Sequence, residues 1–446
     1  MTSSSSSRLA STNSEFLALR PQYTTDISRL VRHVQAAVDW EAAHGLVLRA
    51  PKANDQLLRD ESSVGWLESA VIHAPVSFAP SPVPRREFEK VVALQPLLNQ
   101  LFDKISQDHE FLASTLESIG SADEFTAKIF SMYMELHSLG VAKPGVIGIH
   151  RSDYLIHAPD SEPDALPKAK QVEFNTIASS FASLSSIVGD FHRYMLARTG
   201  YKDLLESGVI TEDQLPKNES LTSIGDAIAA GFDLYGNKDD DKEVAVAYYR
   251  SGYAPTDFPT EKEWDGRWLI EKSRTICIPN LAYHLAGCKK VQQVLAQPGE
   301  AARVRECFVG LYPLDGSADG QQAYADALSS PANYVVKPQR EGGGYNTYGA
   351  DIPALLGRLT EEERKAYILM DLIRTPGFNN VLLREGKLIS SEVVSELGIY
   401  GLWVRDASGR VVVNKHGGHL LRTKASDVYE GGVAAGFAVI DSPLLV

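Results

Sequence analysis

The feature that most constrains this chain is a short apolar strand that runs directly into three consecutive glycines. The strand pattern covers Tyr334-Val-Val-Lys337, and Pro-Gln-Arg-Glu leads from it to Gly342-Gly-Gly344. Consecutive glycines let backbone N–H groups approach an oxyanion without obstruction by a Cβ atom. Lys337 and Arg340 add positive charge there, and Glu341 could hold a metal ion. A plain glycine turn explains the run equally well, and it is not a Walker P-loop because G-x-x-x-x-G-K-[ST] does not occur.

A second polar signal lies on the strand predicted over Lys170-Gln-Val-Glu-Phe-Asn175. The alternation of a strand places Glu173 and Asn175 on the same face. Hard Mg²⁺ prefers carboxylate-type oxygens together with nucleotide phosphates, so Glu173 and Asn175 with Glu341 would form a magnesium set. Taken alone the pair is a weak signal, because most such residues are solvated strand positions.

The third signal is the C-terminal block Asn414-Lys-His-Gly-Gly-His419, followed by Arg422 and Lys424. Cations beside glycines suit an anionic ligand. His416 and His419 have the spacing of a metal pair, but without cysteine nearby they are interpreted as structural or hydrogen-bonding histidines. Gly431-Gly-Val-Ala-Ala-Gly436 is either a tight turn or the wall of a pocket.

The pattern of elements is that of a mixed α/β enzyme with its polar signatures in strand-end loops. A helix is predicted from Asp26 to Gly45, an extended surface crossing over Pro75–Pro84, and helices from Arg85 to Leu139. A strand over Gly145–His150 is expected to lead into a polar loop at Arg151–Tyr154. Further predictions are helices to Gly236, a buried strand over Val244–Tyr249, and strands over Tyr367–Met370, Ser391–Val394, Ile399–Val404 and Val411–Asn414.

Composition excludes several classes of protein. The formal charge is −13 over 446 residues, which argues against a nucleic-acid binder, and no apolar run reaches the length of a membrane span. Cys277, Cys288 and Cys307 are few and not in CxxC spacing, so reduced, mostly buried thiols of a cytoplasmic protein are expected. The Ser-rich stretch Met1–Asn13 has too little arginine for a transit peptide, so a disordered tail is predicted.

Other catalytic motifs fail. There is no HExxH helix, no G-x-S-x-G elbow and no G-x-G-x-x-G loop. Without an obvious nucleophile, and with several phosphate-friendly loops, nucleotide-driven ligation is favoured over hydrolysis.

Six blocks together closely resemble eukaryotic glutathione synthetase, a family of ATP-grasp ligases, and the match runs from about Asp26 to Val446. In chain order the blocks are Arg151-Ser-Asp-Tyr154, Glu173-Phe-Asn-Thr-Ile177, Leu285-Ala-Gly-Cys-Lys-Lys-Val-Gln-Gln293, Lys337-Pro-Gln-Arg-Glu-Gly-Gly-Gly344, Ser395-Glu-Leu-Gly398 and Leu420-Leu-Arg-Thr-Lys424.

The resemblance implies a role for each matching residue. Magnesium ligands would be Glu173, Asn175 and Glu341. The catalytic cations would be Arg422 and Lys337. ATP contacts would be Glu173, Lys289, Lys337, Pro338, Gln339, Arg340, Glu341, Gly342, Gly343, Gly344, Tyr345, Asn346, Tyr348, Met370, Asp371, Leu372, Ile373, Glu396, Lys424 and Glu430. Peptide-substrate contacts would be Arg151, Ile177, Ala178, Ser179, Ser180, Arg250, Ser251, Gly252, Tyr253, Arg422, Val433 and Ala434.

The fold implied is an ATP-grasp fold of mixed α/β class, with a helical N-terminal part, a small substrate-binding domain and a glycine-rich lid. The expected divisions are a tail over 1–25, the N-terminal main body over 26–226, the substrate domain over 227–288 and the ATP-grasp part over 289–446. Such an enzyme would be a cytoplasmic homodimer that uses ATP, Mg²⁺, γ-glutamylcysteine and glycine. An acyl phosphate would form first, and glycine would then displace phosphate.

The chain departs from the family in one large respect. Between Gly236 and Val244 the family carries a strand–loop–helix–strand stretch that contributes substrate contacts, and here only Asn237–Glu243 joins the two ends. The alternatives to an active enzyme are an impaired, ATP-binding and dimerising isoform, or a homoglutathione synthetase that uses β-alanine. Ala434-Ala435 resembles the glycine-using enzymes. Smaller departures are Asp371-Leu372 for the usual Glu-Lys, and Ala178 for a common serine.

Overall fold

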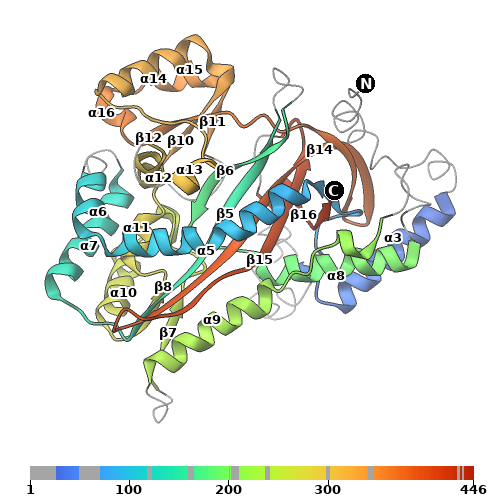
Figure 1. Cartoon of the computed structure of the whole chain (residues 1–446), viewed down its shortest axis with the longest axis horizontal. Helices are drawn as coiled ribbons and strands as arrows, with labels where there is room; N and C mark the ends of the chain where they lie inside the picture. The colour runs from blue at the N-terminus through green and yellow to red at the C-terminus, as the bar shows by residue number, and fades with distance from the viewer. Residues whose placement is uncertain are drawn as a thin grey trace, which may run out of the picture.

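The structure is a computed structural model that describes residues 27–49, 71–117, 123–158, 165–199, 201, 210–236, 242–297, 302–339, 345–428, 432–433 and 436–446. Its centre is a large, almost entirely antiparallel sheet with long strands (Figure 1). Among the described strands of this sheet, only β16 and β3 pair in parallel. In spatial order the strands are β13 (Phe378–Arg384), β3 (Val76–Ser77), β16 (Ala438–Asp441), β15 (Val411–Ala425), β14 (Lys387–Asp406), β5 (Gly145–His157) and β6 (Lys168–Asn175).

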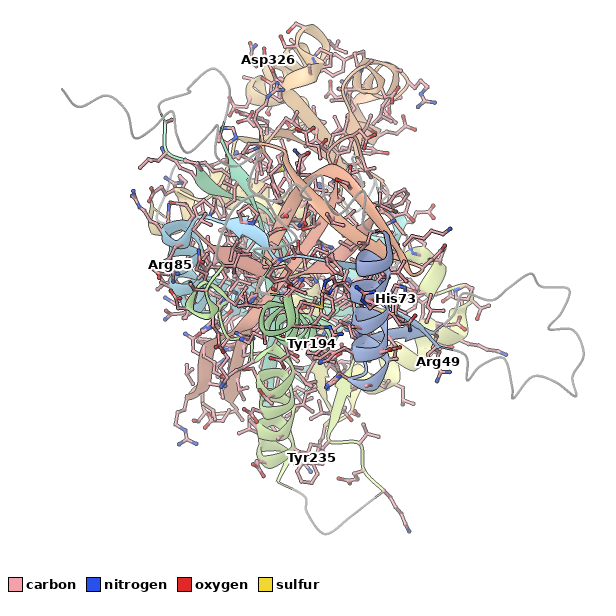
Figure 2. All side chains as sticks on the ribbon, turned by 90° about the vertical axis from the view of Figure 1, so that its right-hand side faces the viewer. Arg49, His73, Arg85, Tyr194, Tyr235 and Asp326 are labelled. Carbon is pink, nitrogen blue, oxygen red and sulfur yellow. The ribbon has the colours of Figure 1, made fainter. Side chains whose placement is uncertain are left out.

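Helices cover both faces of this sheet, as the alternation along β14 requires. Leu397 and Ile399 belong to a core shared with α5 (Arg85–Gln107), α7 (Glu124–Leu139) and α11 (Leu281–Ala286). Leu402 and Val404 belong to a second core, on the side of α3 (Ile27–Ala43), α8 (Ala182–Thr199) and α9 (Ser220–Tyr235). On that side Trp40 of α3 stacks on Tyr194 of α8, with ring centroids 5.6 Å apart. Figure 2 labels Tyr194 and shows α3 and α8 side by side.

A smaller sheet lies at the top left of Figure 1, together with α14 (Ala318–Ser329), α15 (Asp351–Leu356) and α16 (Glu361–Arg364). Val336 and Leu369 pack with the helices on one face of it. Val335 and Met370 face the opposite way and pack with Leu155 and Val172 of β5 and β6. The small sheet therefore meets one edge of the large sheet. Its strands are, in order, β11 (Thr347–Tyr348), β10 (Tyr334–Pro338), β12 (Tyr367–Asp371) and β9 (Leu311–Pro313).

The remaining elements are short. Two-stranded sheets form between β1 (Val47–Arg49) and β2 (Val71–His73), β4 (Ser81–Val83) and β17 (Pro443–Leu445), and β7 (Val246–Tyr248) and β8 (Ile276–Ile278). The other helices are α6 (His109–Leu116), α10 (Glu261–Lys272), α12 (Lys289–Ala296) and α13 (Ala302–Arg305), with single 3₁₀ turns η2 (Glu212–Gln214), η3 (Pro255–Asp257) and η4 (Pro331–Asn333). Among the described residues, no helix is long and apolar enough to cross a membrane.

Several predictions of elements are confirmed. The mixed α/β class holds, and the first helix begins at Ile27 and ends at Ala43, shortly before Gly45 in the left-handed region (φ 75°). The helical stretch that begins at Arg85 ends at Leu139, and Gly140 (φ 61°) terminates it. The three cysteines are buried, and none of them forms a disulfide within the part of the chain that the structure describes.

Other predictions are wrong. Pro75–Pro84 is not a surface crossing: Val76 is fully buried and Phe78 nearly so, because β3 and β4 pair with strands of the C-terminal part. The expected loop Arg151–Tyr154 is the continuation of β5, which bonds to β14 and β6 on its two sides. The predicted strands Ser391–Val394 and Ile399–Val404 are one strand, β14.

The strand predicted over Val244–Tyr249 is shorter and less buried than expected. β7 covers Val246–Tyr248, all three residues are only partly buried, and Val244 is 63% exposed. The predicted tail 1–25 and most of the linker Asn237–Glu243 lie outside the described residues. The divisions at 226 and 288 stay predictions.

Candidate functional site

Charged side chains gather where four adjacent strands of the large sheet face the small sheet. The register sets Asp153 of β5 opposite Glu173 of β6 on one side and opposite Gly398 of β14 on the other. Glu396 of β14 lies opposite Arg422 of β15. Positions two apart on one strand share a face, so this register brings four separate sequence blocks to one surface.

Asp153 is the centre of this cluster and is fully buried. It accepts hydrogen bonds from Arg151 Nε (2.6 Å) and Nη2 (2.8 Å), from Arg422 Nη2 (3.1 Å) and from Asn175 Nδ2 (3.0 Å). Burial alone would lower the pKa of Arg151, but the charge of Asp153 beside it holds that pKa above its ordinary value. One buried carboxylate thus holds two guanidinium groups that were predicted to bind the peptide substrate.

Gly398 leaves the space in which Arg151 and Asp153 meet. A Cβ atom at this position would lie 2.8 Å from both Arg151 Cδ and Asp153 Oδ1. The last position of the Ser395–Gly398 block is therefore glycine for a steric reason, because any side chain there would push the Arg151–Asp153 pair aside.

Glu173 faces two lysines at the junction of the sheets. Its Oε2 lies 2.8 Å from Nζ of Lys289, the first residue of α12. Burial would raise the pKa of Glu173, but the charges of Lys289 and Lys337 outweigh it and hold the pKa well below the ordinary range. One turn further along α12, Gln292 bonds the backbone of Phe174 through its Oε1 (3.2 Å) and Nε2 (3.4 Å). α12 is thereby joined to the strand that carries Glu173.

Lys337 reaches this cluster from the small sheet. It lies on β10 two residues after Val335, so its side chain shares the face that meets β6. Its Nζ donates to the Val172 carbonyl over 3.1 Å, and the residue is 5% exposed. Burial lowers the pKa of Lys337 to about 8, against the opposing pull of Glu173. The Lys337 ammonium is therefore poorly solvated and suited to binding an anionic ligand.

Glu396 completes the cluster as an ion-pair partner of Arg422. Burial raises the pKa of Glu396, and the nearby charges of Asp153 and Glu173 act in the same direction against Arg422. The pKa of Arg422 is raised, because the charges of Glu396 and Asp153 outweigh its burial. Four cations thus face three carboxylates in this part of the described chain, which leaves an excess of positive charge for an anionic ligand.

An apolar cluster adjoins the charges. Met370 and Ile373, both predicted nucleotide contacts, pack with Val335 and against Leu155 and Val172 of the large sheet. Apolar side chains of this kind suit contact with the face of a nucleobase.

Asp371 turns away from this apolar cluster toward β9. Its Oδ2 accepts from the Gly310 N–H (2.9 Å), and burial raises its pKa. The Asp371 carboxylate is thus engaged inside the small sheet.

The predicted substrate loop Ile177–Ser180 has an unusual backbone. Ala178 (φ 51°) and Phe181 (φ 70°) both adopt the left-handed region, which residues with a Cβ atom seldom occupy. Tyr400 helps to hold the loop, because its hydroxyl donates to the Ser180 carbonyl over 2.5 Å. Such strain persists only where surrounding contacts enforce it, which is typical of a ligand-binding loop.

The second predicted substrate loop, Arg250–Tyr253, is organised by Asp257. Its Oδ2 accepts from the backbone N–H groups of Gly252 (2.9 Å) and Tyr253 (3.1 Å), and Gly252 has a φ of 94°. Arg250 and Ser251 are exposed, and Arg250 lies over the ring of Tyr248. The described contacts do not join Arg250 to the charged cluster.

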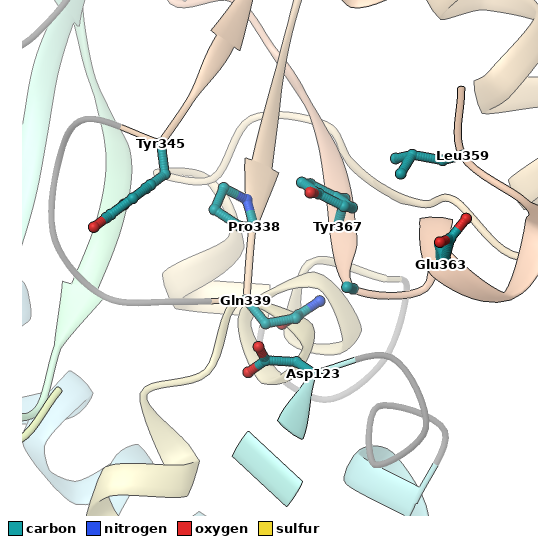
Figure 3. A pocket seen from close by; sticks show the side chains of 8 residues that line it. Asp123, Pro338, Gln339, Tyr345, Leu359, Glu363 and Tyr367 are labelled. Carbon is teal, nitrogen blue, oxygen red and sulfur yellow. The ribbon is translucent and has the colours of Figure 1, made fainter. Parts of the chain in front are cut away.

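Gln339 has a structural contact that its predicted role did not include. Its Oε1 accepts from the backbone N–H of Lys290 over 2.7 Å, which links the end of β10 to the start of α12. Gln339 also lines a pocket of about 320 Å³ (Figure 3). Pro338, Gln339 and Tyr345 of the predicted ATP contacts line this pocket, but none of the cluster's charged side chains does, so the charges that suit the phosphates of ATP lie in the cluster. The other lining residues are Asp123, Leu359, Glu363, Ala366 and Tyr367.

The remaining predicted site residues are dispersed. Asn346 Nδ2 lies 3.4 Å from the Tyr348 hydroxyl, and Val433 is buried in the core on the side of α8. Lys424 lies between Val394 and Ala438 in the large sheet. Arg340, Glu341, Gly342, Gly343, Gly344, Glu430 and Ala434 lie outside the described residues.

The oxygen donors fit magnesium only in part. Glu173 is held as a carboxylate, and both described hydrogen bonds of Asn175 use its Nδ2, which leaves Oδ1 as a possible ligand. The third predicted ligand, Glu341, is outside the described residues. Within the described ranges, no group of three His, Cys, Asp or Glu side chains could hold a metal ion.

Asp153, Gln292 and Gly398 were missed as functional residues, although each stands in one of the six blocks that resemble the family. A signal was available for Asp153: it stands two residues from Arg151, and a strand continuing through Tyr154 would have put both on one face.

Comparisons with known proteins show which family this chain resembles. The sequence model described as "Eukaryotic glutathione synthase, ATP binding domain" matches residues 28–445. Glutathione synthetase from Mus musculus is 35% identical over 487 aligned positions, covering 94% of this chain and 97% of the mouse protein. Chloroplastic glutathione synthetase from Solanum lycopersicum is 34% identical over 84% of this chain and 78% of its own length. The solved structure of a glutathione synthetase-like effector from Globodera pallida in its apo form has a TM-score of 0.70 at 21% identity, covering 96% of this chain and all of that one, and so supports the fold.

Proposed function

This chain belongs to the eukaryotic glutathione synthetase family, and from that premise we propose which of its residues carry out the reaction. It is an ATP-dependent ligase of glutathione synthesis. Its substrates are ATP, γ-glutamylcysteine and glycine. The observation that carries the assignment of the site is the convergence of Lys289, Lys337, Arg422 and Glu173 where the two sheets meet.

ATP is proposed to lie between the sheets. Its base would lie against the apolar cluster of Val335, Met370 and Ile373, and its phosphates would reach Lys289 and Lys337. The poorly solvated ammonium of Lys337 supports this placement, because a phosphate would restore the charge interactions that burial removed. The predicted glycine-rich lid follows Lys337 directly in the sequence.

The peptide is proposed to lie over Arg151 and Arg422. A carboxylate oxygen of its cysteine residue attacks the γ-phosphorus of ATP, the bond to the bridging oxygen breaks, and ADP leaves. The glycine amine then attacks the acyl carbon, phosphate departs, and the amine loses a proton. Arg422 would stabilise the negative charge in both steps, and positioning with charge neutralisation needs no covalent nucleophile.

Glu173 and Asn175 would hold Mg²⁺, with Glu341 as the predicted third ligand. When bound, the ion supplies neutralisation of phosphate charge. The anionic state of Glu173 supports this choice, as does the Oδ1 of Asn175, which takes part in neither of the described hydrogen bonds of that residue. A homodimer and a cytoplasmic location are also proposed from the family resemblance; relatives named as chloroplastic occur in Solanum lycopersicum and Arabidopsis thaliana.

One observation favours a second candidate, an impaired member that binds ATP without efficient turnover. The alignment with the mouse enzyme has 487 positions, more than the 446 residues of this chain, so the relative has residues with no counterpart here. We place the gap between Gly236 and Val244, and the 63% exposure of Val244 beside the short β7 supports the loss of neighbouring strands.

The lysines of α12 offer a matched test of the site. Lys289→Met removes the ammonium that faces Glu173, whereas Lys290→Met removes a neighbour whose Nζ lies 3.6 Å from Asp315 outside the cluster. We expect ATP binding, measured by calorimetry with Mg²⁺ present, to weaken about tenfold or more in Lys289→Met only. Equal affinities in the two variants would contradict the placement of ATP.

A further inference from the structure

Asp153 accepts more hydrogen bonds inside the charged cluster than the binding roles proposed for the other cluster residues explain. It is fully buried and accepts four hydrogen bonds, two from Arg151 and one each from Arg422 and Asn175. It is too enclosed by these partners to contact a substrate itself. Its position between two guanidinium groups is therefore what needs an explanation.

We infer that Asp153 is a positioning residue that presets Arg151 and Arg422 as one receptor for an anionic group of the peptide substrate. This inference rests on the proposed function of the site. The two arginines come from strands β5 and β15, which are separated by β14 in the sheet. Asp153 of β5, opposite Gly398 of β14, is an acceptor that both guanidinium groups share, and it fixes them relative to each other.

Two features of the structure favour this arrangement. Gly398 on the intervening strand β14 has no side chain, so the Arg151–Asp153 pair lies directly over it. Arg151 is engaged through both Nε and Nη2, a two-point contact that fixes the plane of the guanidinium group. The remaining N–H groups of that fork then point in set directions before any ligand arrives.

Arg422 has a second polar partner that a ligand could replace. Glu396 is its second partner, and burial together with the charges of Asp153 and Glu173 raises the pKa of Glu396. Glu396 is 16% exposed and Asp153 is wholly buried, so Asp153 is the fixed partner of Arg422 and Glu396 the more exchangeable one. An incoming carboxylate would compete with Glu396 and leave Asp153 in place.

Positioning and simple electrostatics predict opposite results for Asp153→Asn. The substitution removes one negative charge, so a purely electrostatic role predicts tighter binding of an anionic substrate. An asparagine also puts an N–H₂ group against arginine donors, so the fork loses an acceptor and its orientation. Positioning therefore predicts weaker binding of the peptide.

The matched control is Asp103→Asn. Asp103 is 3% exposed and accepts from the Tyr283 hydroxyl (2.8 Å) and from Arg405 Nε (3.2 Å), so it is an equally buried aspartate of the same chain outside the cluster. Substituting it tests what the loss of a buried carboxylate does to the fold alone.

The experiment measures KM and Kd for γ-glutamylcysteine and Kd for ATP in the full chain. Asp153→Asn is expected to raise both constants for the peptide about 10- to 100-fold, with the Kd for ATP changed less than about threefold. Asp103→Asn should change none of the three. An unchanged or lower KM and Kd for the peptide in Asp153→Asn would overturn the inference, even if stability falls.

Two further measurements keep the test decisive. If Asp153→Asn does not fold, Gly398→Ala displaces the same pair without changing any charge, and the same rise for the peptide is expected. If the wild type binds no γ-glutamylcysteine, the proposed substrate fails, and the positioning role is read from the Arg151 Nε–H signal by NMR. That signal should exchange slowly in the wild type and in Asp103→Asn and be lost in Asp153→Asn; its persistence in Asp153→Asn would refute the role.

Discussion

Lys337 should make ATP binding depend on pH in a range where an ordinary lysine would not. Burial lowers the pKa of this ammonium to about 8, whereas an unperturbed lysine titrates near 10.4. A phosphate binds the protonated form, so affinity should fall as the pH rises through this pKa. Lys337 should be about 90% protonated at pH 7 and about 10% at pH 9.

These fractions give the size of the effect. If only the protonated form of Lys337 binds phosphate, the association constant for ATP falls about tenfold between pH 7 and pH 9. Isothermal titration calorimetry at several pH values, in buffers of different ionisation enthalpy, measures both the affinity and the proton taken up on binding. Proton uptake should be greatest near pH 8 to 9.

Lys337→Arg is the matched control, because arginine stays charged throughout this range. The variant should bind ATP with an affinity that is nearly constant from pH 7 to pH 9. If the wild type and Lys337→Arg lose affinity in parallel, another group causes the dependence and the placement of Lys337 against the phosphates is wrong.

Three further results are expected. Gln292→Leu should weaken ATP binding without removing any charge, because Gln292 joins α12 to the backbone at Phe174; an affinity equal to the wild type by calorimetry would show that α12 needs no such anchor. Asp257→Ala should raise KM for the peptide more than KM for ATP, since Asp257 shapes the Gly252–Tyr253 loop, and a uniform fall in kcat would contradict this. Burial raises the pKa of Glu41 to about 7 from 4.5. The stabilising contribution of its neutral form is therefore present below pH 4.5 and lost as pH rises through 7, by about 3 kcal/mol at most. In urea denaturation, the free energy of unfolding of Glu41→Gln should lack this decrease with pH.

The parts of the fold that could be predicted from sequence are those with a strong local pattern. The helices from Arg85 to Leu139 and the strand of Lys337 have a clear period, and glycines mark several ends. Pro75–Pro84 was misjudged because proline content indicates a surface crossing, whereas pairing with β13, β16 and β17 buries this segment. Such long-range pairing produces no pattern in the local sequence.

The residues of the site likewise divide into those that could be predicted from the sequence and those that could not. Glu173, Lys337 and Arg422 could be chosen from residue type and family resemblance, and the structure brings them to one place. Asp153 could not, because its importance depends on Arg422 from 269 positions away in the chain. A polar residue after an apolar strand is usually read as the start of a loop, and only the continued pairing of β5 with β14 and β6 shows otherwise.

The most direct test of the account is the product formed by the purified chain from ATP, Mg²⁺, γ-glutamylcysteine and isotope-labelled glycine, identified by mass spectrometry, with ADP release measured in parallel and β-alanine as the alternative amine. The account predicts labelled glutathione in equal amount to ADP, dependent on glycine and much reduced with β-alanine. No labelled glutathione from folded, ATP-binding protein would contradict the ligase activity of this chain, and a preference for β-alanine would contradict glycine as its amine substrate.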